Sequence, residues 1–294
     1  MHPKRMLGRT CRTMLLALPA LLVLLAGSTN AADSVDSFAL GTKQDPKDIL
    51  LGLNEEIDSD YLDAPQKILS MPNNPAYFIA QDGKELFHKK RGPNNASLAK
   101  CDFGQGPGKL KGAYVKLPRY FEDTGRVMNA ESRLVYCMKT IQGFSEDSKA
   151  VQNRGDLKKM LTYIASQSNG YEWAPSVDDP MEKAMRDAGE AMFYRRAGKL
   201  DQNCATCHYE TGTSVRASAM PSIQIPQEWT KAVSWPAFRL GKRDIRSPYQ
   251  RIRGCYYQMR KGLIQPRSDA AIAMQLFWLD SARGQPAILP DLKR

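Results

Sequence analysis

The sequence predicts a mainly α-helical protein built from two tandem copies of one domain. Three observations support this prediction: helix-start signals followed by apolar residues at helical spacing, an internal repeat, and a five-residue motif of cysteine and histidine in the second copy. We divide the chain into a signal peptide (1–31), an N-terminal extension (32–72), a first domain (73–166), a linker (167–178) and a second domain (179–294).

Two segments of the second copy carry the features of a helix start. Asp179-Pro180-Met181-Glu182 supplies an N-cap aspartate, a proline at the first helical position and a glutamate at the third. Ser268-Asp269 opens another helix, which runs through Leu279 and closes near Gly284. Asn74-Pro75 starts the matching helix of the first copy. After Asp179, the residues expected to form an apolar, core-facing helix face are Met181, Ala184, Met185, Ala188 and Met192.

The internal repeat has a constant spacing around the cysteine motif. Gly83, Phe87 and Gly92 match three residues of the same types 106 positions later. The matching segments are 83–92 with 189–198, 133–137 with 251–255, and 161–166 with 276–281. The second pair shares the pattern R-x-x-x-C. Both ends of a duplicated domain are therefore represented.

Cys204-Ala-Thr-Cys207-His208 is a C-x-x-C-H sequence, the attachment motif of a c-type haem. Two thiols at this spacing can form thioethers with the two vinyl groups of one porphyrin, and the adjacent imidazole can bind the iron as proximal ligand. A zinc or redox C-x-x-C is the alternative, and zinc would need further ligands in a chain with only three histidines. At the repeat offset, Leu98 and Asp102 replace Cys204 and His208. We therefore expect one covalently bound haem c, in the second domain only.

The N-terminus has the pattern of a cleavable secretory signal. Four positive residues precede an apolar run at 14–26, which is too short to span a membrane, and small residues follow it. Export agrees with c-type haem and permits disulfides, as in the bacterial periplasm. No later run is long enough for a membrane span. Removal of the four positive residues of this signal lowers the net charge from +11 to +7, so the exported chain is still basic. A basic surface favours anionic substrates or acidic proteins, and no nucleic-acid-binding motif is present.

The remaining cysteines of the exported chain follow from the repeat. Cys101 corresponds to a haem-attachment position, and Cys137 corresponds to Cys255. With no haem between them, Cys101 and Cys137 can form a disulfide that stabilises the first domain by about 2–4 kcal/mol. Cys255 is left unpaired, and nearby cations such as Arg251 favour its thiolate. We expect Cys255 to be the distal ligand of the haem iron; Met259 is the alternative, as is a Cys255 that only packs as a small buried thiol.

These features resemble the SoxA family, the catalytic cytochrome subunits of periplasmic thiosulfate-oxidising Sox systems. The residues that carry the resemblance are C-A-T-C-H and R-I-R-G-C-Y-Y-Q-M-R-K-G, and the resemblance covers nearly the whole exported chain. The degraded first motif is similar to that of single-haem members. The resemblance implies two cytochrome c-like domains and L-cysteine S-thiosulfotransferase activity. It also implies that Cys255 is an axial ligand and the catalytic cysteine, found as a persulfide, and that Arg251 binds substrate.

The same resemblance implies the partners. Thiosulfate is joined oxidatively to a cysteine of the SoxYZ carrier, and two electrons leave through haem to a SoxX-like cytochrome c subunit or another downstream cytochrome c. Arg251 suits the substrate because a guanidinium can clamp the sulfonate of dianionic thiosulfate with paired hydrogen bonds. The sulfur is either held on Cys255 and then passed to the carrier, or both substrates meet beside a Cys255 persulfide.

Two other functions stay open at this point. A His/Met electron-transfer cytochrome c would use Met259, and a thiosulfate dehydrogenase would form tetrathionate without a carrier. We expect segment 242–246 and Lys261 to form a solvated or docking face, and the tryptophans of the second domain to pack in the core or haem pocket. These tryptophans are Trp229, Trp235 and Trp278.

Overall fold

The computed structural model describes residues 75–215 and 218–293. The predicted signal peptide and N-terminal extension lie outside the described residues. Within this part the protein is mainly helical, which confirms the predicted fold class. By their internal contacts the described residues belong to one unit. None of its described helices is both long and apolar enough to cross a membrane.

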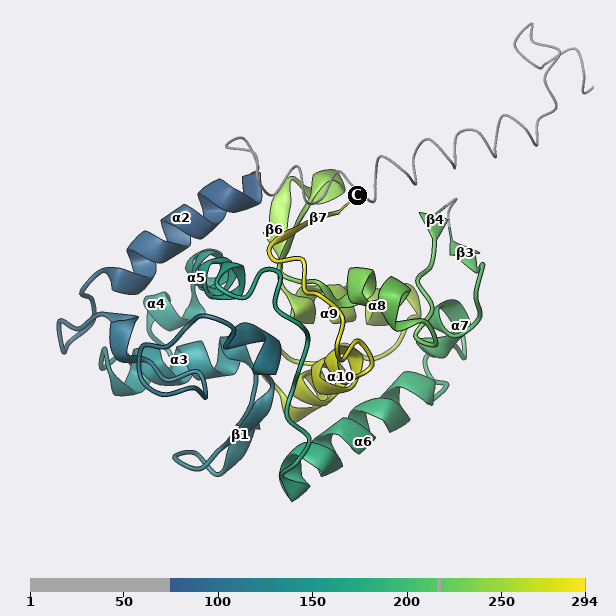
Figure 1. Cartoon of the computed structure of the whole chain (residues 1–294), viewed down its shortest axis with the longest axis horizontal. Helices are drawn as coiled ribbons and strands as arrows, with labels where there is room; N and C mark the ends of the chain where they lie inside the picture. Colours follow the sequence, from purple (N-terminus) through teal and green to yellow (C-terminus); the bar gives the residue numbers. More distant parts are fainter. Residues whose placement is uncertain (1–74, 216–217, 294) are drawn as a thin grey trace, which may run out of the picture. The chain divides into compact units, whose positions relative to one another are not determined.

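The first half contains four α-helices and one short hairpin within the described residues (Figure 1). Its elements are α2 (Pro75–His88), η2 (Leu98–Lys100), η3 (Tyr114–Lys116), β1 (Arg119–Phe121), β2 (Arg126–Met128), α3 (Ala130–Thr140), α4 (Lys149–Gln152) and α5 (Arg154–Ser166).

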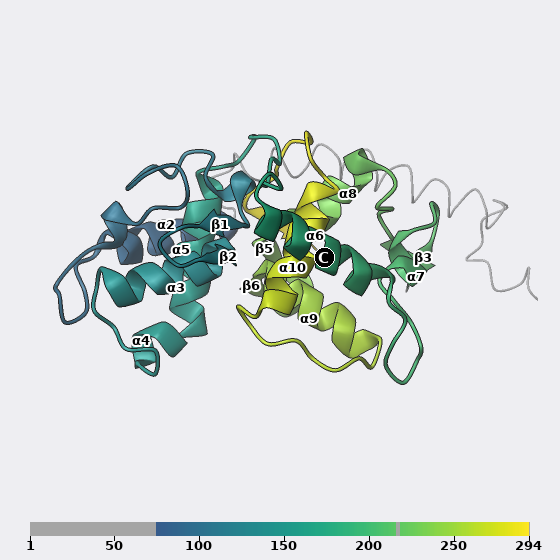
Figure 2. The same cartoon turned by 90° about the horizontal axis from the view of Figure 1, so that it is seen from below.

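The second half repeats this order with insertions, and the two halves lie side by side in both views (Figures 1 and 2). Its elements are α6 (Pro180–Tyr194), α7 (Ala205–His208), β3 (Ser214–Val215), β4 (Ser218–Ala219), α8 (Pro226–Val233), β5 (Ala237–Arg239), η4 (Leu240–Lys242), β6 (Asp244–Arg246), α9 (Pro248–Gln258), α10 (Asp269–Asp280) and β7 (Asp291–Lys293).

The repeated glycines have a common structural role. A Cβ atom on Gly83 would lie 2.0 Å from the carbonyl oxygen of Lys159, and one on Gly189 would lie 2.1 Å from that of Ala273. Each glycine therefore lets the first helix of its half, α2 or α6, cross the last helix, α5 or α10, at backbone contact. The repeat in the sequence records this helix crossing.

The aromatic residues of the repeat also superpose, with one difference from the sequence match. Phe87 and Phe193 are both buried. The Phe87 ring contacts Tyr163 at 5.5 Å between centroids, and the Phe193 ring contacts Phe277 at 5.3 Å. In the second half the structural equivalent of Tyr163 is therefore Phe277, although the sequence match aligns Tyr163 with Trp278, one residue later. The final helices correspond by the position of the helix crossing and not by the match of residue types.

The hairpin and helix that follow the motif correspond at a larger spacing. β1 pairs antiparallel with β2, and β5 pairs antiparallel with β6, three residue pairs in each case. Each hairpin leads directly into a helix with a complete capping box, at Asn129 for α3 and Ser247 for α9. These caps lie 118 positions apart. In the second half β7 adds to β5 in parallel.

The predicted helix starts are confirmed, whereas the predicted buried face of α6 is correct only in part. Asp179 caps α6 and forms a capping box with Glu182, and Ser268 caps α10. However, Met181 is 48% exposed, and two of the four other residues expected to face the core, Ala184 and Ala188, are also exposed. The buried residues of α6 are Glu182, Gly189 and Phe193.

Polar contacts explain this orientation of α6. The Glu182 carboxylate accepts a hydrogen bond from the Tyr120 N–H at 2.6 Å and another from the Ser176 hydroxyl. Because these bonds and the glycine crossing both lie on the same side of the helix, they leave Met181, Ala184 and Ala188 exposed, while Met185 and Met192 pack partly buried against the core. Hydrophobic periodicity alone does not record either constraint.

The predicted linker is a packed segment. The Gly170 N–H donates to the Ala287 carbonyl and the Trp173 N–H to the Gln285 carbonyl, both at 2.9 Å. Trp173 is fully buried. Segment 167–178 is therefore hydrogen-bonded along the chain just before β7.

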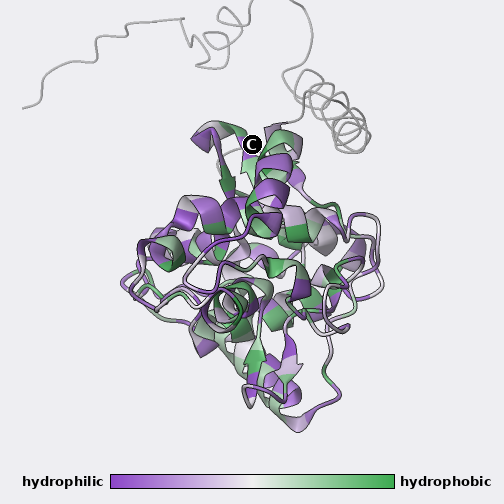
Figure 3. Ribbon diagram, turned by 90° about the vertical axis from the view of Figure 1, so that its left-hand side faces the viewer, coloured by the Kyte–Doolittle hydropathy of each residue, from purple (hydrophilic) through white to green (hydrophobic). Residues whose placement is uncertain are grey.

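One cluster of buried apolar residues runs through both halves, from Phe87 to Leu289. Polar bonds cross between the halves as well: the Tyr114 hydroxyl donates to the Trp235 carbonyl at 2.7 Å, and the Asn129 amide donates to Gln275 at 2.8 Å. Figure 3 shows hydrophobic and hydrophilic residues alternating along the helices around this core. The halves are thus joined by burial and by hydrogen bonds.

Candidate functional site

The C-x-x-C-H motif forms a single turn of helix. Cys204 is the N-cap of α7. Its carbonyl accepts hydrogen bonds from the N–H groups of Cys207 at 3.2 Å and His208 at 3.1 Å. Both cysteines and the histidine are therefore held on one short turn, which is the arrangement that a covalently attached haem requires.

His208 is prepared to bind a metal through one ring nitrogen. Its side chain is almost fully buried, and Nδ1 lies 3.0 Å from the Pro221 carbonyl, to which it donates. Nε2 is thus the nitrogen left for a ligand. Burial lowers the pKa of His208 and Arg251 lowers it further, against the opposing effect of the Pro221 carbonyl. The imidazole is therefore neutral, as an iron ligand must be. The Trp229 ring packs edge-on against it at 5.4 Å.

The described chain has three free cysteines, Cys204, Cys207 and Cys255. Burial raises the pKa of Cys204 to about 12, and the neighbouring Cys255 and Cys207 add to this rise. Burial also raises the pKa of Cys207, again with a contribution from Cys255. Cys255 is thus near enough to both motif cysteines for its charge to act on them, although it lies about 50 residues further along the chain.

Helix α9 places Arg251 and Cys255 one turn apart on the same face. Arg251 also lies close to His208, since its charge lowers the pKa of that imidazole. Within the described residues the Arg251 guanidinium has no hydrogen-bond or ion-pair partner. Met259, the alternative axial ligand, is the buried C-cap residue of the same helix. The structure thus brings Arg251, Cys255 and the motif together.

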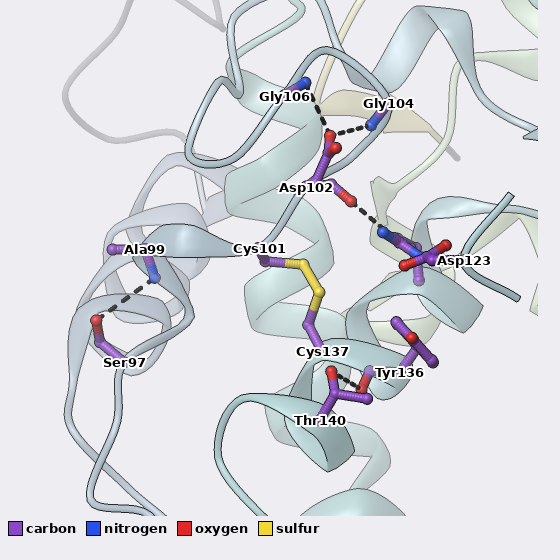
Figure 4. The surroundings of a disulfide bond; sticks show 11 residues. Ser97, Ala99, Cys101, Asp102, Gly104, Gly106, Asp123, Tyr136, Cys137 and Thr140 are labelled. Atoms are coloured by element: carbon purple, nitrogen blue, oxygen red, sulfur yellow. Dashed lines mark hydrogen bonds and ion pairs between the residues drawn. A yellow bond between two sulfur atoms is a disulfide. The ribbon is translucent and has the colours of Figure 1, made fainter. Parts of the chain in front are cut away.

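The corresponding region of the first half contains a disulfide in place of a haem-binding motif. Cys101 and Cys137 are bonded, with their Cα atoms 5.7 Å apart (Figure 4). Asp102, at the repeat position of His208, accepts hydrogen bonds from the N–H groups of Gly104 at 2.7 Å and Gly106 at 2.9 Å. An aspartate engaged in its own loop is not an axial ligand for haem iron.

Arg133, the counterpart of Arg251, is fully engaged in that half. It is 4% exposed. Its guanidinium donates to the Asp102 carbonyl at 2.7 Å and forms an ion pair with Asp123 at 2.8 Å. It also lies 4.1 Å from the centroid of the Phe121 ring. The arginine of the R-x-x-x-C pattern therefore has partners within the protein in the first half, whereas in the second half its guanidinium has none among the described residues.

Two arginines near the site were missed or misjudged from the sequence. Arg239 on β5 lies near Arg251, Arg246 and Cys255, because their charges contribute to its pKa. Arg246 was expected on a solvated face with segment 242–246. Instead it is partly buried beside the buried Ile245, and its Nε atom is buried without a partner in the described chain. The strands are three residues long and carry no periodicity that would reveal this pairing.

Two other expectations for this region concern Lys261 and the tryptophans of the second half. Lys261 donates to the Arg195 carbonyl at 3.0 Å, so it also stabilises the loop before the motif. The tryptophans of the second half are buried, as predicted: Trp229, Trp235 and Trp278.

These residues fit a haem c. Two thiols on one turn can form the thioether bonds, a neutral buried imidazole offers Nε2 to the iron, and an aromatic side chain packs against that imidazole. Among the described residues, no group of three or more histidine, cysteine or acidic side chains is placed to hold a metal ion by itself.

Comparison with known proteins agrees with this site. The family model for the SoxA/TsdA cytochrome c domain matches residues 82–173, which lie in the first half. The L-cysteine S-thiosulfotransferase subunit SoxA of Hydrogenophilus thermoluteolus is 37% identical over 75% of this chain and 83% of its own length. A SoxA subunit of Hydrogenobacter thermophilus is 31% identical over 74% of this chain and 83% of its own length.

A solved structure shows the same fold. The crystal structure of SoxXA from P. pantotrophus matches with a TM-score of 0.65 and 26% identity, and covers 75% of this chain and 79% of the matched chain. The duplicated helical halves, the C-x-x-C-H turn and the R-x-x-x-C helix therefore occur together in a chain that is more than 30% identical to curated SoxA subunits over most of their length. The chain belongs to the SoxA family of c-type cytochromes.

Proposed function

We propose that this chain is the catalytic subunit of a periplasmic L-cysteine S-thiosulfotransferase and carries one haem c. Cys204 and Cys207 attach the haem, and His208 and Cys255 are its axial ligands. Cys255 is the catalytic cysteine, which carries a persulfide, and Arg251 binds the substrate. The observation that carries the proposal is a difference between two equivalent arginines. The Arg251 guanidinium lies one turn from Cys255 and beside His208 and has no hydrogen-bond or ion-pair partner in the described chain, whereas Arg133 is hydrogen-bonded and ion-paired.

The reaction is an oxidative conjugation. One S–S bond forms between the carrier cysteine and the outer sulfur of thiosulfate, the carrier thiol loses its proton, and two electrons leave. The haem, when bound, supplies the electron acceptor next to the reacting sulfur. Arg251 binds the sulfonate oxygens and compensates their charge, which is a favourable role for a guanidinium fork. Cys255 holds sulfur one helical turn from that sulfonate.

The partners follow from this reaction. The carrier is a SoxYZ-like protein that presents a cysteine on a mobile segment, and the electrons pass to a SoxX-like cytochrome c bound as a heterodimer or to another downstream cytochrome c. The solved structure that this chain resembles is of SoxXA from P. pantotrophus, which supports a SoxX-like partner. The signal peptide at residues 1–31 directs export to the periplasm, where both haem attachment and the Cys101–Cys137 disulfide are feasible.

The test uses the protein produced with haem attachment and its signal removed, together with the carrier and thiosulfate. We expect mass spectrometry to show one haem, and we expect carrier conjugation coupled to cytochrome c reduction. Cys255→Ala should abolish conjugation and alter the haem spectrum. Arg251→Ala should raise the KM for thiosulfate about tenfold or more, while Arg253→Ala, on the exposed side of α9, should not.

The same experiment separates the two competing functions. An unchanged haem spectrum in Cys255→Ala, with Met259 as ligand, would indicate a His/Met electron-transfer cytochrome. Tetrathionate formed from thiosulfate in the absence of carrier would indicate a thiosulfate dehydrogenase. Two haems per chain would contradict the assignment of the first half.

A further inference from the structure

The two halves differ systematically around the R-x-x-x-C arginine. Residues 118 positions apart occupy the same places in the two hairpins, since the hairpins share their register and lead into equivalent capped helices. Three residues of the hairpin that precedes the arginine change between the halves. They are Phe121, replaced by Arg239; Asp123, replaced by Gly241; and Met128, replaced by Arg246.

In the first half two of these three residues contact the arginine directly. The Phe121 ring covers the Arg133 guanidinium at 4.1 Å, Asp123 neutralises it at 2.8 Å, and Met128 is buried. The cavity beside Arg133 is also lined by carboxylates: Asp102, Glu122, Asp123, Asp178, Asp179 and Glu182. A free anion entering this cavity therefore meets these carboxylates, the ion-paired Arg133, and Arg119, which donates to the Gly104 carbonyl at 2.6 Å.

In the second half the same places present positive charge. Ala237 pairs with Arg246 and Arg239 pairs with Asp244 across the hairpin, so both arginine side chains leave the same face of the sheet. Asp244 shares that face, but its carboxylate is bonded to Lys158 at 2.5 Å. The carboxylate at the position of Asp123 has been lost, because Gly241 has no side chain.

Arg246 has an unsatisfied donor on this face. Its Nε–H is buried and has no acceptor in the described chain, which is unfavourable for any buried donor and more so for a charged one. Burial lowers the pKa of Arg239, and Arg251 and Arg246 lower it further, while Cys255 acts in the opposite direction. Arg239 therefore lies within electrostatic range of Arg246, of Arg251 and of Cys255.

We infer that Arg246 and Arg239 extend the Arg251 site into a three-arginine pocket that binds an oxyanion beside Cys255. The ligand is a group with two or three charged oxygens, which can accept the paired N–H bonds of a guanidinium fork. This chemistry has two sources at this place: the sulfonate of thiosulfate, or a carboxylate of the bound haem. The inference deepens the proposed function and rests on it only for the identity of the sulfonate.

The two halves supply the test variants. Arg246→Met and Arg239→Phe install the residues that the first half already carries in the same hairpin, so the fold should accept them. Arg246→Lys keeps the charge and removes the fork. Arg253→Met removes one positive charge from the exposed side of α9 and is the matched control. Far-ultraviolet circular dichroism and the haem absorption spectrum report whether each variant has folded and taken up haem.

Two measurements on the haem-loaded protein distinguish the sources. Calorimetric titration with thiosulfate needs neither carrier nor turnover, so it reads the pocket even if conjugation fails. If the sulfonate binds here, Arg246→Met should weaken thiosulfate binding about tenfold, Arg246→Lys should weaken it less, and the haem potential should match that of the control. If a haem carboxylate binds here, thiosulfate affinity should be unchanged and the haem potential and its pH dependence should shift.

Either result supports an oxyanion pocket at these arginines and names its occupant. The inference is overturned if Arg246→Met and Arg239→Phe match Arg253→Met in both thiosulfate affinity and haem potential. A wild-type protein that binds thiosulfate through Arg246 but never conjugates it to the carrier would contradict the proposed function and leave the pocket standing.

Discussion

Reduction of the Cys101–Cys137 disulfide should destabilise the first half by an amount set by the loop it closes. The two cysteines are 36 residues apart. In the chain-entropy description this loop lowers the entropy of the unfolded chain enough to stabilise the folded state by about 3.8 kcal/mol at 25 °C. For a urea dependence of about 2 kcal/mol/M, loss of the bond should move the unfolding midpoint down by about 1.9 M.

The assay is urea unfolding followed by far-ultraviolet circular dichroism, with hydrogen exchange measured in α3 and α5. Wild-type protein is compared with and without a reductant, because both sulfur atoms then stay in the buried site. The double variant Cys101→Ala, Cys137→Ala is the control and should not respond to the reductant. A fall of less than about 1 kcal/mol in the wild type would refute the loop-entropy argument and show that the unfolded chain already keeps this loop closed.

Three further outcomes are expected. Gly189→Ala and Gly83→Ala should each destabilise the folded protein by about 1–3 kcal/mol through overpacking and so lower its Tm, although the same change stabilises a helix that makes no close crossing. A Tm that rises would contradict the contact between the helix backbones. Burial holds the pKa of Glu131 above its ordinary 4.5 despite two nearby arginines, so the folded state binds the proton more tightly than the unfolded state does. The free energy of unfolding should therefore fall as the pH rises past 4.5. Glu131→Gln should make the stability measured by urea unfolding less dependent on pH in this range. In protein made without haem attachment, non-reducing peptide mapping should find a disulfide between Cys207 and Cys255, because their counterparts Cys101 and Cys137 form one in the first half. Free thiols at both positions would contradict this equivalence of the two halves.

Local chemistry explains which parts of the fold were readable from the sequence. The hydrogen bonds that cap α6 and α10 join Asp179 and Ser268 to groups within four residues, so the sequence alone locates the starts of these helices. The spacing of Gly83 and Gly189 was visible because each helix crossing tolerates no side chain. The buried face of α6 was not readable, since Glu182 is bonded to groups that are brought to it by the tertiary fold.

The site shows the same division. C-x-x-C-H and R-x-x-x-C are contiguous patterns, and both were found. Arg239 and Arg246 belong to it through a three-residue hairpin pairing, which leaves no trace in the spacing of hydrophobic residues. The comparison that reveals them is between the two halves, and it requires the register of both hairpins. Sequence matching at one fixed offset could not supply this, because the spacing changes from 106 to 118 between the motif and the hairpin.

The pairing of segment 167–178 with residues far along the chain has a consequence for the order of folding. The N–H of Gly170 and that of Trp173 find their acceptors at Ala287 and Gln285, which follow the last helix of the second half. The segment that ends the first half therefore completes its hydrogen bonds only after α10 and the residues beyond it are in place. The C-x-x-C-H motif lies between the two paired segments in the sequence, so its surroundings are closed by the same late step.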